Sequence, residues 1–232
     1  MCQGADTMKR KRNLALFCGM LGCLCFGAGD WLMLYGDTAH SGSLYWLTEG
    51  AAHIASWRNG LAMALSFPGI VLYGAALFAL QGCIKEQRHQ KVYHYLTAFG
   101  LTPWIALHLF YIMILYLFSW MNESGFAQAA IPVSKVLYHH LSWVVIASEA
   151  MMLPPFIYWA YLLATGKSVL PRRMAVSNPL ILYLVLYLFK SCLPDSPFQI
   201  GFTNGLMSES MLIWFGVFML WNIRRENRDI SD

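Results

Sequence analysis

Long apolar segments constrain this chain more than any other feature of its sequence. A transmembrane helix needs about 20 consecutive, mostly apolar residues, and six segments meet or approach that length. They lie at about residues 14–35, 60–81, 94–119, 133–163, 177–193 and 201–223, the fifth being the shortest. Only 12% of the residues are charged, about half the fraction that is usual in a soluble domain. The sequence therefore predicts an all-α, polytopic membrane protein with six transmembrane helices, located in the cell (plasma or inner) membrane.

The basic residues predict the orientation of these six spans. Of the 16 lysines and arginines, 13 precede span one, lie between spans two and three or four and five, or follow span six. Only Arg58, Lys135 and Lys190 remain for the other side. Loops rich in lysine and arginine stay in the cytoplasm, so both termini are predicted to be cytoplasmic. The chain then divides into a basic tail (1–13), one membrane domain (14–223) and a second tail (224–232).

The composition and one local pattern indicate partners. A net charge of +4 on so apolar a chain does not predict nucleic-acid binding; membrane lipids and a lipid-like or small polar ligand are the expected partners. Small residues recur every four positions in span one, at Ala15, Gly19, Cys23 and Gly27. Such a stripe lets helices approach closely, either within the chain or between the protomers of a homo-oligomer.

The segment 44–58 precedes span two and has an amphipathic pattern. Glu49 and His53 are four residues apart, and Trp57 falls on the same side of a helix. We predict an amphipathic helix here that lies at the outer membrane surface.

Ionisable residues inside the predicted spans indicate a functional site. A charged group at the centre of a bilayer costs about 2.5–3.5 kcal/mol on insertion scales, so such residues are expected to face the bundle interior. Asp30, His108, His139 and Glu209 come from spans one, three, four and six and map to the outer half of the bundle. We predict that these four residues face one outward-opening cavity and are the catalytic residues.

A second group of residues is predicted to bind the substrate. His53 and Arg58 lie at the outer surface, where the Arg58 guanidinium suits an anionic head group. Trp104 shares a helical stripe with His108, and Glu149 lies deeper in span four. Asn204 shares a small, polar stripe with Ser208 and Glu209.

These residue types are compatible with several functions. A glutamate in apolar surroundings donates a proton and a nearby histidine accepts one, which predicts an enzyme that acts on a lipid or isoprenoid-like substrate. In a metal-assisted form of this enzyme, His and carboxylate side chains would hold an ion. The sequence contains no H-E-x-x-H or H-x-x-x-H pattern. It therefore does not predict which metal or cofactor, if any, the protein binds. The alternatives are a small-solute or proton-coupled transporter and a non-catalytic receptor or assembly partner.

The inner halves of the spans favour the enzyme over the transporter. The segments 14–22, 70–80 and 211–220 contain no charged residue, whereas a transporter exposes its site to both sides and usually has polar residues along both paths. We therefore predict a cavity that is closed toward the cytoplasm. Glu149 is the main argument against this prediction, because it lies deep enough in span four to begin a path to the cytoplasm.

Overall fold

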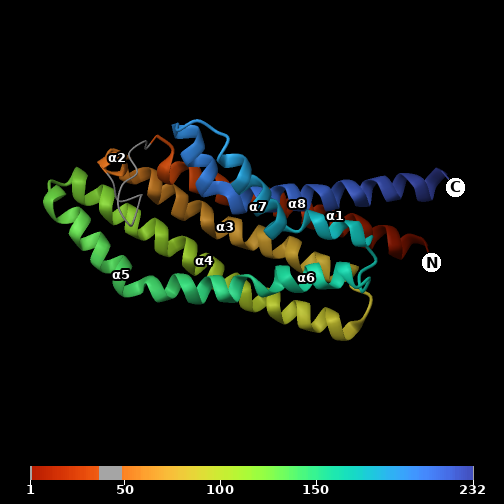
Figure 1. The fold of residues 1–232 in the computed structure, drawn as a ribbon. Helices are drawn as coiled ribbons and strands as arrows, with labels where there is room; N and C mark the ends of the chain where they lie inside the picture. Colours follow the sequence, from red (N-terminus) through yellow and green to blue (C-terminus); the bar gives the residue numbers. More distant parts are fainter. Residues whose placement is uncertain (1, 37–48, 232) are drawn as a thin grey trace.

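The computed structural model describes residues 2–36 and 49–231, and every regular element in this part of the chain is a helix (Figure 1). The elements are α1 (Cys2–Leu34), α2 (Glu49–Ala52), α3 (Ser56–Leu80), the 3₁₀ helix η2 (Gln81–Cys83), α4 (Gln87–Glu123), α5 (Ala127–Met152), α6 (Pro154–Ala164), the 3₁₀ helix η3 (Arg172–Ser177), α7 (Pro179–Lys190) and α8 (Pro197–Ser231). The predicted all-α class is confirmed.

Five helical segments of the described chain are long and apolar enough to cross a membrane. They are Arg10–Leu34, Ser56–Cys83, Gln87–Glu123, Ala127–Ala164 and Pro197–Arg224. The predicted fifth span corresponds to α7, which has 12 residues. At 1.5 Å per residue α7 measures about 18 Å, well short of a hydrocarbon core of about 30 Å. It begins late because Pro179 occupies its first turn, where the Asn178 side chain accepts a hydrogen bond from the Leu180 backbone N–H (3.0 Å).

The predicted fourth span is divided into two helices. The chain leaves the α-helix at Leu153, and α6 starts at the double proline 154–155. Proline has no backbone N–H and its ring clashes with the preceding turn, so α5 cannot continue regularly through this point. The interruption brings Leu153 to the cavity described below.

The segment before α3 differs from the predicted surface helix over residues 44–58. Residues 44–48 lie outside the described residues, α2 ends at Ala52 and the chain is not helical again until Ser56. Ser56 donates hydrogen bonds from its backbone N–H (2.7 Å) and its hydroxyl (2.6 Å) to the Glu123 carboxylate. Helix α3 therefore starts at Ser56, fixed to the end of α4.

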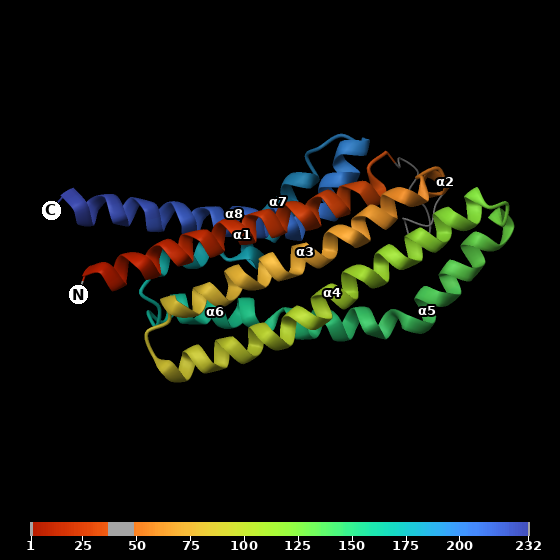
Figure 2. The same ribbon diagram turned by 180° about the vertical axis from the view of Figure 1, so that it is seen from behind.

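The two ends of the chain and the basic loops lie at one end of the bundle, here called the basic end (Figures 1 and 2). Arg12, near the start of α1, donates to the Asn222 side chain of α8 (2.8 Å) and to the Cys83 sulfur after α3 (3.6 Å). The two basic loops also pair, because the Lys85 N–H donates to the Lys167 carbonyl (2.9 Å). The turn between α4 and α5 lies at the opposite end (Figure 1).

The small-residue stripe of α1 packs within the chain, against α3 and α8. A Cβ added to Gly19 would overlap the Ala76 side chain of α3 and come within 2.9 Å of the Phe215 ring of α8. Cys23 is buried, and the nearest atom to a Cβ on Gly27 is the Ser208 Cβ at 3.6 Å.

Substituting Gly19 with alanine tests this packing. Alanine normally favours a helix over glycine by about 1 kcal/mol, yet we expect Gly19→Ala to destabilise the protein by about 1–3 kcal/mol because overpacking forces the helices apart. Thermal unfolding in detergent measures the effect. Gly82→Ala is the matched control, since a Cβ there meets nothing within 4 Å; equal stability of both variants would contradict the packing.

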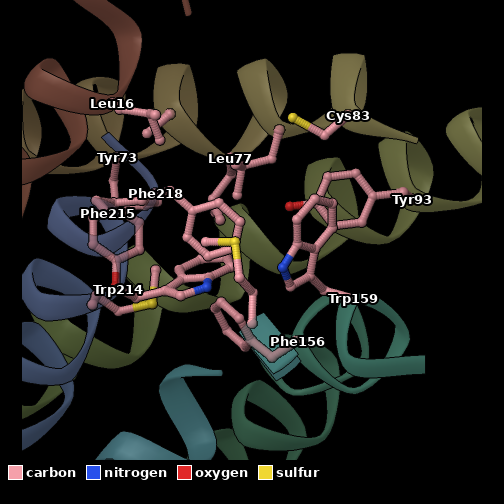
Figure 3. Close-up of a cluster of buried hydrophobic side chains, with 14 of the residues drawn as sticks. Leu16, Tyr73, Leu77, Cys83, Tyr93, Phe156, Trp159, Trp214, Phe215 and Phe218 are labelled. Carbon is pink, nitrogen blue, oxygen red and sulfur yellow. The ribbon is translucent and has the colours of Figure 1, made fainter. Parts of the chain in front are cut away.

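A cluster of buried aromatic side chains packs between α1, α3, α4, α6 and α8 (Figure 3). We call eight of its nine rings the aromatic core: Tyr73, Tyr93, Trp104, Phe156, Trp159, Trp214, Phe215 and Phe218. The ninth, Phe26, lines the cavity described below. Trp214 contacts the rings of Phe156, Trp159 and Phe218 at centroid distances of 5.9, 6.3 and 5.5 Å. Cys83, which contacts Arg12, belongs to the same cluster, so the aromatic core extends to the basic end.

Candidate functional site

A cavity of about 400 Å³ lies in the bundle between α1, α4, α7, α8 and the α5–α6 interruption. Its polar or ionisable lining side chains are Asp30, His108, Tyr111, Glu149, Tyr183, Thr203, Asn204 and Ser208. A second cavity of about 230 Å³ adjoins it and shares Asp30, His108, Tyr111, Thr203 and Asn204. The shared side chains therefore lie where the two cavities meet.

Asp30 and His108 form the centre of this site. The Asp30 Oδ1 lies 3.6 Å from the His108 Nδ1, and the Ser208 hydroxyl donates a hydrogen bond to the Asp30 Oδ2 (3.0 Å). Only 12% of the Asp30 side chain and 11% of the His108 side chain are exposed. Three helices, α1, α4 and α8, thus supply one row of side chains in the order Ser208, Asp30, His108.

The second ring nitrogen of His108 is not satisfied within the described residues. The Nε2 atom is buried and has no hydrogen-bond partner there, while the edge of the ring packs against Phe26 at a centroid distance of 4.8 Å. A buried polar atom without a partner costs about 1–3 kcal/mol. A bound molecule that hydrogen-bonds this nitrogen would recover that cost.

The aromatic core separates the cavity from the basic end. On α4 and α8 the core residues Tyr93 and Phe218 lie nearer the basic end than the cavity residues of the same helices, and Trp159 on α6 lies nearer the basic end than the lining residue Leu153. Trp104 belongs to both, because it lines the cavity and contacts Tyr73 and Phe156 edge to face. Aromatic rings therefore block this side of the cavity.

The side wall of the cavity is more open. Glu149 at the end of α5, Leu153 at the helix interruption and Tyr183 on α7 line the cavity and are all exposed, Leu153 by 39% and Tyr183 by 40%. The cavity consequently reaches the surface of the bundle sideways, between the α5–α6 interruption and α7.

Five of the predicted site residues line this one cavity: Asp30, His108, Glu149, Asn204 and Trp104. Glu149 was expected to lie deeper than the others, but it lines the same cavity as Asp30. Asn204 also donates from its side-chain nitrogen to the Ile200 carbonyl of its own helix (2.9 Å).

Glu209 occupies a different hollow. It lies between α1 and α8 beside Leu24, Gly27 and Ala28, in a space of about 310 Å³. Its Oε1 accepts a hydrogen bond from the Trp31 indole N–H (3.3 Å). Ser208 is the only residue that lines both this hollow and the main cavity, so the structure does not bring Glu209 to His108.

The three other predicted residues also lie away from the cavity lining. His139 is exposed on the outer face of α5, and His53 is exposed after α2. Arg58 donates from Nη2 to the backbone carbonyls of Trp31 (3.4 Å) and Tyr35 (2.9 Å). It therefore caps the last turn of α1 instead of facing a ligand.

Sequence reasoning missed four polar lining residues: Tyr111, Tyr183, Thr203 and Ser208, the last noted only as part of a polar stripe. Tyr111 follows His108 by three residues and Ser208 follows Asn204 by four, spacings that predict a shared face. Thr203 directly precedes Asn204, and consecutive residues of a helix do not share a face. Tyr183 gave no such signal, because its role depends on where α7 packs.

The described residues offer no set of metal ligands. Within residues 2–36 and 49–231, no group of three or more His, Cys, Asp or Glu side chains is placed to hold a metal ion. The lining residues His108, Asp30 and Glu149 are groups that can form hydrogen bonds and transfer protons.

Comparison with known proteins identifies a family but no characterised relative. No curated protein and no solved structure matches the chain. The sequence model of DUF6796, a family of unknown function, matches residues 8–225, and because this is nearly the whole length, the chain belongs to that family.

Proposed function

We propose that this chain is an integral membrane enzyme that takes a lipid-like molecule into the cavity and transfers protons to or from it through His108 and Asp30. The observation that carries the proposal is the row Ser208, Asp30, His108 in a cavity that the aromatic core closes on one side. A carboxylate beside one imidazole nitrogen orients the ring and stabilises its protonated form, and the other nitrogen then exchanges the proton.

The sideways opening supports a substrate from the bilayer. The mouth lies between helices, and two of its three exposed residues, Leu153 and Tyr183, are apolar or aromatic, the third being Glu149. A molecule with an apolar tail can keep that tail among lipids while its head group reaches His108. A soluble substrate would gain nothing from such a mouth.

The transporter remains the second candidate because of one observation. Glu149 lines the cavity and is exposed at its mouth, and carboxylates within membrane helices often relay protons. The aromatic core argues against this function, since alternating access needs a second path from the cavity to the basic end.

We also propose six crossings with both termini in the cytoplasm, at the basic end. In this arrangement residues 174–178 and α7 together make the crossing for which α7 alone is too short, and Arg172 and Arg173 stay at the basic end. The shared location of the start of α1, the end of α8 and the basic loops supports it (Figure 1), because an even number of crossings returns the chain to the same side.

Cysteine labelling tests this topology. With the native cysteines replaced, a cysteine at Arg172 should resist a membrane-impermeant maleimide added to intact cells and react after permeabilisation, whereas one at Ser124, in the α4–α5 turn, should react in both cases. The reverse pattern would refute the orientation.

A paired assay tests the function. The purified chain is reconstituted into liposomes made from a total membrane lipid extract, and lipids are quantified by mass spectrometry while an entrapped dye reports proton flux. We expect conversion of at least one lipid species and no flux above that of empty liposomes. Proton flux that Glu149→Gln abolishes, without lipid conversion, would overturn the enzyme and support the transporter.

A further inference from the structure

We infer that the cavity binds a cationic head group, an ammonium carried on an apolar tail, and excludes phosphate head groups. The inference deepens the proposed function and rests on it for the role of the cavity. It replaces the anionic head group that the sequence suggested for Arg58.

The charge of the cavity lining supports a cation. Two carboxylates, Asp30 and Glu149, line it, while lysine and arginine are absent from the lining residues, all of which the structure describes. His108 is the only basic side chain there. The cation expected to hold a phosphate, Arg58, is hydrogen-bonded to backbone carbonyls at the end of α1.

The groups that contact Asp30 do not supply a full positive charge. Its two oxygens face a neutral hydroxyl and an imidazole ring, at 3.0 and 3.6 Å. A buried carboxylate without a full positive partner is costly, and a cation nearby offsets that cost. A phosphate in the same place would face two like charges with no lysine or arginine to balance them, which disfavours it strongly.

Aromatic side chains complete the site. Phe26, Trp104, Tyr111 and Tyr183 line the same cavity as the two carboxylates. Aromatic faces attract ammonium groups, and sites for quaternary ammonium ligands combine several such rings. The apolar remainder of the wall and the sideways mouth suit the tail.

Direct binding tests the inference with two ligands that differ only in the head group. The full chain is purified in dodecyl maltoside, whose head group is neutral, and equilibrium binding of radiolabelled dodecyltrimethylammonium is measured above that of empty micelles. Dodecyl phosphate serves as competitor. We expect saturable binding that unlabelled dodecyltrimethylammonium displaces and dodecyl phosphate does not.

Two carboxylate variants and two controls locate the binding. Asp30→Asn and Glu149→Gln should each weaken binding by at least about tenfold, because a close charge pair is lost. His139→Gln changes an exposed side chain of α5 and should bind as the parent does. Glu209→Gln makes the same chemical change as Glu149→Gln in the adjacent α1–α8 hollow and should weaken binding less than either lining variant. Size-exclusion elution and the unfolding temperature verify that each variant is folded.

The result also separates this inference from the proposed function. Displacement by dodecyl phosphate, or unchanged binding in both carboxylate variants, would overturn the cationic head group even if lipid conversion is found. Saturable, Asp30-dependent binding in a protein that converts no lipid would uphold the ligand class and overturn the enzyme.

Discussion

Replacing His108 with glutamine is expected to lower the rate of lipid conversion by at least about 100-fold. A positioned acid–base side chain contributes about 10²–10⁴-fold to a reaction rate, and glutamine is polar and of similar length but cannot take up a proton. His108 is also the only side chain in the described lining that combines a nitrogen near a carboxylate with a second, unpartnered nitrogen. The measurement is the initial rate in the liposome assay, with each variant at equal protein content.

The chain supplies its own control for this substitution. His139→Gln makes the same chemical change on the exposed face of α5, and we expect its rate to stay within about twofold of the parent. Asp30→Asn should fall between the two, because it leaves the imidazole in place but removes the carboxylate that orients it. Equal rates for the His108 and His139 variants would refute the catalytic role, provided that both elute as folded protein.

The contrast between these two histidines shows what periodicity can and cannot predict. On α4, His108 lies 3.6 Å from Asp30, in line with the expectation that ionisable residues within long apolar helices face the bundle interior. On α5, His139 and Glu149 are ten residues apart, or about 15 Å along the helix. Both would line one cavity only if that cavity extended about 15 Å along α5. Glu149 lines the cavity, whereas His139 lies beyond it, nearer the α4–α5 turn.

Neighbouring residues on α8 make the same point at shorter range. Ser208 and Glu209 are consecutive and were predicted as one polar face, yet Ser208 donates to Asp30 whereas Glu209 accepts from Trp31. Consecutive residues diverge by about 100° on a helix. A broad polar stripe can therefore line two separate hollows, and only the position of α1 decides which residue enters which.

The ends of helices could be predicted where basic loops or prolines mark them, and less well where neither does. The basic loops and the interrupted fourth span follow from local chemistry. The short α7 does not, because the apolar run 177–193 is equally compatible with a full span. Its two ends are set by Pro179 and by the return of the chain into α8, and the cavity mouth beside Tyr183 depends on both.

Replacing Trp214 with alanine is expected to cost about 3–5 kcal/mol of stability, the usual range for a buried Trp-to-Ala change. Its side chain is fully buried among four other aromatic rings of the core (Figure 3). Dispersion contacts dominate packing between helices in a membrane, so an unfilled space there loses them outright. Thermal unfolding in detergent should show a midpoint lowered by roughly 10 °C.

The exposed Trp143 on α5 is the matched control for the aromatic core. Its side chain is 64% exposed, so Trp143→Ala should change stability by less than about 0.5 kcal/mol. The comparison bears on function because the core is also the wall that closes the cavity toward the basic end. If Trp214→Ala were as stable as Trp143→Ala, the core would not be tightly packed, and the one-sided cavity that favours an enzyme over a transporter would lose its main structural support.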